Sequence, residues 1–83
     1  MRLWFDTNAA VDDHRYSLSC QGTLRDLNAL GAELRHGMKV TLYMEDPDEN
    51  GNMRLLLVDA IVEEDARGFV ARADDATWRR EIL

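Results

Sequence analysis

Residues 38–44 read Met-Lys-Val-Thr-Leu-Tyr-Met, and this stretch indicates the fold more clearly than any other part of the chain. Every second residue is apolar, which is the period of a strand with one buried face. The polar segment 46–52 follows and contains Asn50-Gly51. Asn-Gly between two β-rich segments is a strong sign of a hairpin. We therefore expect the strand at 38–44 to turn back on a partner strand.

The expected partner is the long segment 53–65, which carries apolar residues on both faces. One face holds Leu56, Val58, Ala60 and Val62, and the other holds Leu55, Leu57 and Ile61. This pattern predicts a bent strand that serves two sides of a barrel, or a face covered by a helix or a partner protein. A tight turn at 66–68 and a strand at 69–73 complete a three-stranded meander.

Two further strands and a helix are expected before this meander. Residues 3–5 form an apolar edge strand, and the alternation over 14–21 predicts a second strand that ends at Gly22. Thr23 is a good helix N-cap and Gly31 a good C-cap, so one or two helical turns fit between them. The helix places three leucines at three-residue spacing, and we expect them to pack on the sheet: Leu24, Leu27 and Leu30.

A final helical turn is expected after the meander. Asp74 or Asp75 caps it, Trp78 lies within it, and Arg79 and Arg80 lie near its end, where the helix dipole favours cations. Residues 1–83 thus form a single, mainly β domain. We expect a small antiparallel barrel or strongly bent sheet with one short helix and a C-terminal helical turn.

Composition excludes several classes of function. The chain has 83 residues and a formal net charge of −6, with Lys39 as its only lysine, so broad nucleic-acid binding is not expected. Cys20 is the only cysteine, which rules out an internal disulfide and favours a cytoplasmic location. No apolar run is long enough to cross a membrane, so we expect no membrane insertion. Nothing in the sequence calls for a cofactor.

The segment from 46 to 51 matches the opening of a calcium loop, D-x-D-x-N-G. Asp46, Asp48 and Asn50 would supply the oxygen ligands. Leu57 stands where the loop would need its bidentate glutamate, so a solvated hairpin is the alternative and any calcium association is expected to be weak.

Five arginines are candidates for an anion site if the sheet gathers them: Arg15, Arg67, Arg72, Arg79 and Arg80. The alternative is local pairing with neighbouring acids, which outnumber the bases. No enzyme is expected, because Ser17, Ser19 and His14 form no recognised catalytic motif and serines that alternate along a strand are its solvent face.

From Ser17 onward the chain resembles bacterial PilZ-type barrels. Residues 17–22, Ser-Leu-Ser-Cys-Gln-Gly, are similar to the D/N-x-S-x-x-G element of that family, and residues 34–40 are similar to its L-x-x-G-x-x-V strand entry. Residues 59–62 and 68–70 resemble its closing strands. The family's R-x-x-x-R motif is absent, since Ser19 stands four residues after Arg15. A generic SH3-like barrel explains the same pattern.

The resemblance implies a ligand site for a phosphorylated nucleotide such as a cyclic dinucleotide. Its residues would be Arg15, Ser17, Ser19, Gly22 and Arg72. Our leading expectation is instead a non-catalytic cytoplasmic module that acts through protein interaction or regulation, and its two-faced segment 55–62 could form a homodimer. Nucleotide binding is the first alternative, and weak calcium binding by the loop at 46–52 is the second.

Overall fold

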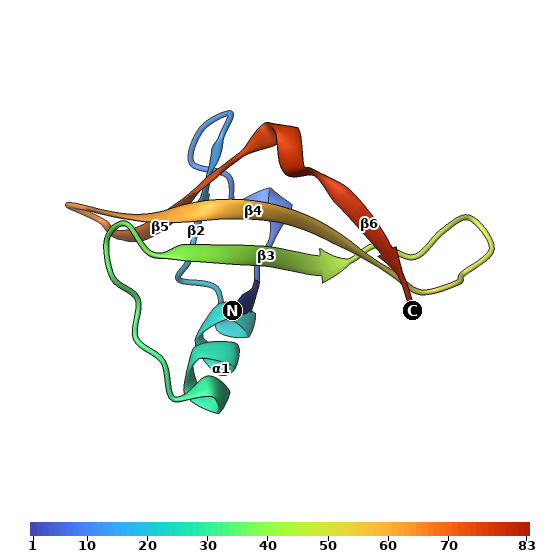
Figure 1. Ribbon diagram of the computed structural model, residues 1–83, viewed down its shortest axis with the longest axis horizontal. Coiled ribbons are helices and arrows are strands. Elements are labelled where there is room, and N and C mark those ends of the chain that lie inside the picture. Colours follow the sequence, from blue (N-terminus) through green and yellow to red (C-terminus); the bar gives the residue numbers. More distant parts are fainter.

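The computed structural model describes every residue from Met1 to Leu83. Six strands form one sheet, accompanied by one α-helix and two short 3-10 helices (Figure 1). In chain order the elements are β1 (Arg2–Trp4), η1 (Thr7–Ala9), β2 (Arg15–Ser17), α1 (Gln21–Leu30), β3 (Lys39–Glu45), β4 (Arg54–Asp65), β5 (Gly68–Ala73), η2 (Asp75–Thr77) and β6 (Arg79–Ile82). The mainly β class with one short helix is confirmed.

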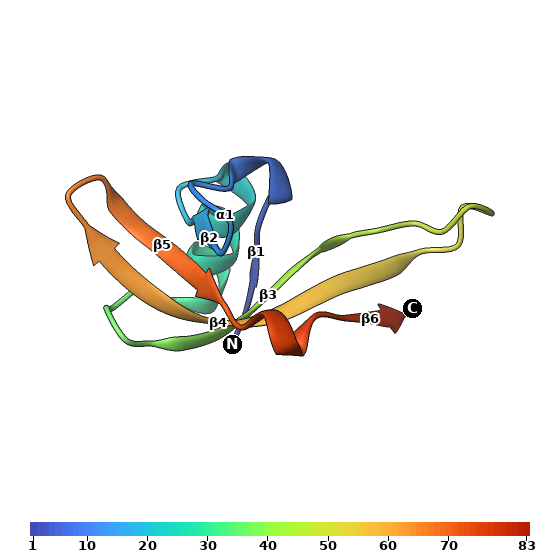
Figure 2. The same ribbon diagram turned by 90° about the horizontal axis from the view of Figure 1, so that it is seen from above.

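The 12-residue strand β4 is the central strand of this sheet. The strand β3 pairs along one side of it, while β5 and then β6 share the other side. Between β5 and β6 the chain leaves the sheet as η2, where Thr77 Oγ1 accepts a hydrogen bond from the Asp59 N–H at 2.8 Å. Figure 2 shows the result: one end of β4 curves up with β5, and the other projects with β3 and β6 as a three-stranded wing.

The remaining strands extend this sheet to the order β1-β3-β4-β5-β2. The pair β1–β3 is parallel, unlike the wholly antiparallel arrangement we expected, and the other pairs are antiparallel. The end strands β1 and β2 do not pair with each other, so strand pairing does not show a closed barrel. The bent-sheet form of the expectation describes this arrangement.

A single apolar cluster fills the concave side of the bent sheet. Its largest fully buried members come from the first strand segment, the hairpin strands and the loop before α1: Leu3, Phe5, Leu18, Leu42, Val58 and Val62. The rings of Phe5, Tyr16 and Trp78 pack together at its rim, with centroids 5.2 to 6.2 Å apart. Leu57 is also buried, although it points to the opposite face of β4. The two-faced pattern of β4 is therefore largely covered within one chain.

The predicted start of the helix is wrong by three residues. The helix α1 begins at Gln21 with Cys20 as its N-cap, so Gly22 lies in its first turn and does not end a strand. Thr23 is fully buried and its hydroxyl donates to the Trp4 carbonyl at 2.6 Å, so it is not free to cap. Gly31 is the left-handed C-cap, as expected, with φ of 63°.

Two leucines of α1 do not pack as expected. Leu27 is buried, but Leu24 and Leu30 are 52% and 55% exposed. The helix lies against the edge of the sheet beside β1 and not across its face (Figure 1), so only one side of its apolar stripe meets the core. No helix of the structure has the length and apolar character needed to span a membrane.

The C-terminal prediction is partly wrong as well. Asp74 caps the short helix η2, as expected, by accepting from the Ala76 N–H. Arg79 and Arg80 do not end a helix, however, because they form β6 on the wing. The first half of β4 has an open side there, and its residues from Arg54 to Leu57 pair with this last strand.

Candidate functional site

Three of the five residues expected to bind a ligand meet in one surface hollow. Arg15, Ser17 and Ser19 line a space of about 510 Å³ between the loop before β2 and the β4–β5 turn. Asp12, Asp65 and Arg67 contribute its other charged groups. Arg72 and Gly22 lie elsewhere. The hollow therefore gathers part of the predicted nucleotide site, with equal numbers of acids and bases at its wall.

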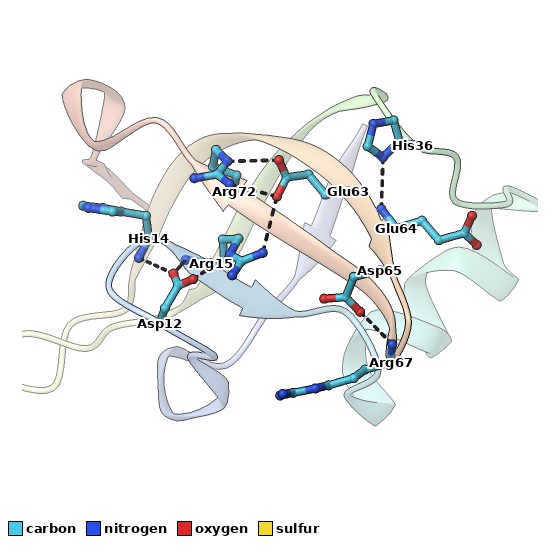
Figure 3. A network of polar contacts seen from close by, with 9 residues as sticks. All are labelled: Asp12, His14, Arg15, His36, Glu63, Glu64, Asp65, Arg67 and Arg72. Carbon is cyan, nitrogen blue, oxygen red and sulfur yellow. Dashed lines mark hydrogen bonds and ion pairs between the residues drawn. The ribbon is translucent and has the colours of Figure 1, made fainter.

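The arginine of this hollow is already engaged by carboxylates. Arg15 Nε lies 2.6 Å from Asp12 Oδ2, and its Nη1 lies 3.9 Å from Glu63 Oε1. Arg72, the β5 residue opposite Arg15, binds the same glutamate through two nitrogens at 3.0 and 3.2 Å (Figure 3). The hydrogen bond to Asp12 raises the pKa of Arg15. An incoming phosphate would have to compete with these carboxylates.

The five arginines do not gather at one place. Arg15 and Arg72 share Glu63, whereas Arg79 pairs with Asp59 at 3.1 Å and Arg80 with Asp46 at 2.6 Å on the wing. Pairing with acids, the alternative we gave to an anion site, describes Arg15, Arg72, Arg79 and Arg80. The acids that bind Arg79 and Arg80 are distant in sequence and not the expected neighbours. The carboxylate of Asp65 accepts a hydrogen bond from the backbone N–H of Arg67, and this contact closes the turn between β4 and β5.

Gly22 is held close to an aromatic ring. A Cβ at this position would lie 2.5 Å from Trp4 Cε3, so the ring of Trp4 lies directly against the helix backbone. Trp4 Nε1 donates to Glu45 Oε2 at 2.9 Å, which fixes the ring's orientation. The glycine is thus required here for packing between β1 and α1.

The free edge of β1 is closed by side chains of α1. The Trp4 N–H donates to Asp26 Oδ2 at 2.9 Å, and the Trp4 carbonyl accepts from Thr23. The Tyr43 hydroxyl donates to the same Asp26 oxygen at 2.7 Å. Burial, together with this hydrogen bond, raises the pKa of Tyr43 to about 12. The helix therefore occupies the outward backbone groups of Trp4, which an additional strand would otherwise use.

The opposite edge of the sheet is covered by the chain itself. Ala10 forms an isolated bridge with Tyr16, and the Val11 N–H donates to the Arg15 carbonyl at 2.9 Å. These contacts lie along the outer side of β2. The strands at the two ends of the sheet thus both have a cover.

The outer edge of β6 has no such cover, because this strand pairs with β4 alone. The Leu83 N–H donates to the Met53 carbonyl at 3.3 Å, so the odd-numbered residues of β6 direct their backbone groups toward β4. Arg80 and Ile82 consequently direct theirs outward. The Ile82 side chain is 82% exposed. The result is a short strand edge with two residues ready to pair.

The acidic loop at 46–52 is a hairpin closed by its own side chains. Asp48 Oδ1 accepts from the N–H groups of Asn50 and Asn52 at 2.9 Å, and this lowers the pKa of Asp48. Asp46 is paired with Arg54 and Arg80. No group of three or more His, Cys, Asp or Glu side chains is placed to hold a metal ion. Calcium binding by Asp46, Asp48 and Asn50 stays a prediction.

Both histidines have partners on the surface. His14 Nδ1 lies 2.6 Å from Asp75 Oδ2, and His36 Nδ1 accepts a hydrogen bond from the Glu64 N–H at 3.1 Å. The hydroxyl oxygen of Ser17 accepts from the Ser19 N–H at 3.2 Å. Each of these contacts links neighbouring loops and strands.

Comparison of the chain with family models, curated proteins and solved structures gave no match. The resemblance to PilZ-type and SH3-like barrels therefore stays a prediction.

Sequence reasoning missed the β6 edge and the Asp26 contacts. Only the weak alternation of Arg79-Arg80-Glu81-Ile82 could have indicated a strand, and the preceding aspartates favoured a helical turn instead. Asp26 carried no signal, because its two donors come from β1 and β3, far away in sequence.

Proposed function

We propose that this chain is a non-catalytic protein-interaction module that binds a partner strand along the outer edge of β6. The observation that carries this proposal is the uncovered edge, on which the backbone groups of Arg80 and Ile82 point outward. Adding a strand to such an edge supplies main-chain hydrogen bonds for affinity, and neighbouring side chains supply specificity. The single unpaired cysteine fits the cytoplasm as the place of this activity.

The contrast between the edges of the sheet supports this choice. Exposed strand edges promote aggregation, and proteins normally block them. Here Thr23 and Asp26 block the edge of β1, and Ala10 and Val11 block that of β2. The edge left open also carries the most exposed large apolar side chain of the chain, Ile82. An uncovered edge next to covered ones is what strand addition requires.

Strand addition at this edge is tested with two substitutions of Ile82, one of which lacks the backbone N–H donor. Ile82→Pro removes the outward N–H, which an edge strand tolerates, whereas Ile82→Thr keeps it and preserves β propensity. Each tagged protein is recovered from the cells that express it after cross-linking. We expect the proline variant to lose its bound protein and the threonine variant to keep it. Equal recovery of the same partner by Ile82→Pro contradicts the proposal.

Nucleotide binding at the hollow is the second candidate, because Arg15, Ser17 and Ser19 converge there. A phosphate would replace Asp12 as the partner of the Arg15 guanidinium. Thermal-shift measurements with cyclic di-GMP test it. A saturable rise in melting temperature that is lost in Arg15→Ala and kept in Arg79→Ala supports this candidate. No shift at millimolar ligand removes it.

A further inference from the structure

We propose that the partner on β6 is a second copy of this chain, paired antiparallel about a two-fold axis at Arg80. This inference rests on the proposed function and adds the identity of the partner and the pairing register. It moves the homodimer contact that we expected from the sequence away from the faces of β4 and onto the edge of β6.

The backbone limits the possible registers. Only Arg80 and Ile82 direct N–H and C=O groups outward, so a second β6 must place one of these residues opposite another. Three two-fold pairings meet this condition: Arg80 opposite Arg80, Arg80 opposite Ile82, or Ile82 opposite Ile82. The side chains decide among them.

Charge complementarity favours the register centred on Arg80. In that register Arg79 stands opposite Glu81 of the second copy, twice by symmetry, in the pair type that brings side chains closest. With Arg80 opposite Ile82, by contrast, Glu81 faces Glu81, and like charges directly opposite are destabilising. With Ile82 opposite Ile82, Glu81 meets an apolar residue, Leu83. Only the first register pairs opposite charges.

The two arginines at the axis do not oppose this register. Each Arg80 guanidinium is bound to Asp46 of its own chain at 2.6 Å, and the same contact lowers the pKa of Asp46. This contact offsets the like charges at the axis, just as the contact of Glu81 with Arg2 would offset Glu81 facing Glu81. The register is therefore favoured by the two opposed Arg79–Glu81 pairs, which it alone forms. Arg79 and Glu81 are likewise oriented by Asp59 and Arg2, at 3.1 and 2.8 Å. The strand edge is ordered before a partner arrives, which reduces the entropy lost on pairing.

A four-residue strand gives a small contact, so the dimer is expected to be weak and concentration-dependent. Sedimentation equilibrium from about 10 µM to about 1 mM covers the range in which such a contact forms. We expect the mass to rise from 9.5 kDa toward twice that value. In two-dimensional NMR, exchange of the Arg80 amide with solvent should slow over the same range, whereas Ile82 then faces residue 78 of the second copy, outside β6.

Two charge variants test the register. In Arg79→Glu the new glutamate would face Glu81 of the second copy, and in Glu81→Arg the new arginine would face Arg79, so each variant alone should stay monomeric. When the two variants are mixed, every opposed pair again carries opposite charges. We expect dimers in the mixture alone. Arg67→Glu changes the net charge as Arg79→Glu does but lies in the β4–β5 turn, away from β6, so this control should dimerise like the wild type.

Each result separates this inference from the proposed function. A wild-type mass of 9.5 kDa at every concentration overturns the homodimer, while edge-dependent recovery of another protein leaves the proposed function standing. A dimer that forms but is unaffected by either charge variant overturns the register. Circular dichroism of each variant establishes that it is folded. Any effect of a substitution within its own chain is also present in the mixture, so dimers that form only in the mixture must come from the contact between the two chains.

Discussion

Replacing Gly22 with alanine should destabilise this protein, although alanine is the better helix former. Gly22 lies in the first turn of α1, and Gly→Ala in a helix alone stabilises by up to about 1 kcal/mol. The new Cβ would lie 2.5 and 2.7 Å from two atoms of the Trp4 ring, closer than side-chain atoms approach one another. The ring must move, because the Cβ is fixed to the helix backbone.

The expected loss follows from what the ring would give up. Overpacking of this kind costs about 1–3 kcal/mol. Movement of the ring also breaks the 2.9 Å hydrogen bond from Trp4 Nε1 to Glu45, which contributes about 0.5–1.5 kcal/mol. After the full gain in helix propensity is subtracted, the free energy of unfolding should fall by about 0.5–3.5 kcal/mol.

Urea denaturation followed by far-ultraviolet circular dichroism measures this change, and a double-mutant cycle isolates its cause. In a Trp4→Val background the ring is absent, so Gly22→Ala should stabilise by up to about 1 kcal/mol. The sign of the effect should therefore reverse between the two backgrounds. If Gly22→Ala stabilises the protein that retains Trp4, the reasoning is refuted.

Three other perturbations have defined outcomes. Burial and the hydrogen bond to Asp26 raise the pKa of Tyr43 from its ordinary value of 10.0 to about 12, so the stability that this shift contributes is lost as the pH rises between these values. Asp26→Asn should lower the pKa of Tyr43 in an absorbance titration. Tyr43→Phe should remove the loss of stability at high pH. Gly31→Ala should reduce stability by about 1–2 kcal/mol in urea melts, since φ is 63° there and no atom contacts the site. The hydrogen bond from Arg80 lowers the pKa of Asp46, so the stability that this contact contributes is present above the usual pKa of 3.8 and is lost as the pH falls. In Asp46→Asn the free energy of unfolding, followed by circular dichroism, should therefore decrease less at acidic pH.

The local patterns of the chain predicted the centre of the fold well. The alternation over 38–44 and the Asn50-Gly51 turn indicated β3 and its hairpin with β4, because strand period and turn chemistry depend on adjacent residues. The parallel β1–β3 pair could not be predicted, since the choice of partner depends on contacts between distant segments. The strand β6 was missed for the same reason. The capping pattern does form η2, but the residues after η2 pair with the open side of β4, which is a tertiary feature.

The candidate sites divide along the same line. Arg15 and Ser17 could be grouped in advance because they alternate along one strand and share a face. Ser19 lies in the loop before α1, because β2 ends at Ser17 and is shorter than the strand expected over 14–21. Gly22 was grouped with them because it matches the glycine of the D/N-x-S-x-x-G element. In the structure a glycine is needed there because the ring of Trp4, 18 residues earlier, lies against the helix backbone. Whether Arg15 is free to bind an anion depends on Glu63, which the bend of β4 brings alongside.

The two side chains by which α1 caps β1 also limit how far this protein can assemble. A sheet with a single accessible margin adds one neighbour and stops, whereas a sheet with two such margins can grow end to end into a filament. Thr23 and Asp26 close the margin at β1. Loss of both side chains would therefore do more than destabilise the monomer, because it would expose a second strand edge, which open-ended polymerisation requires.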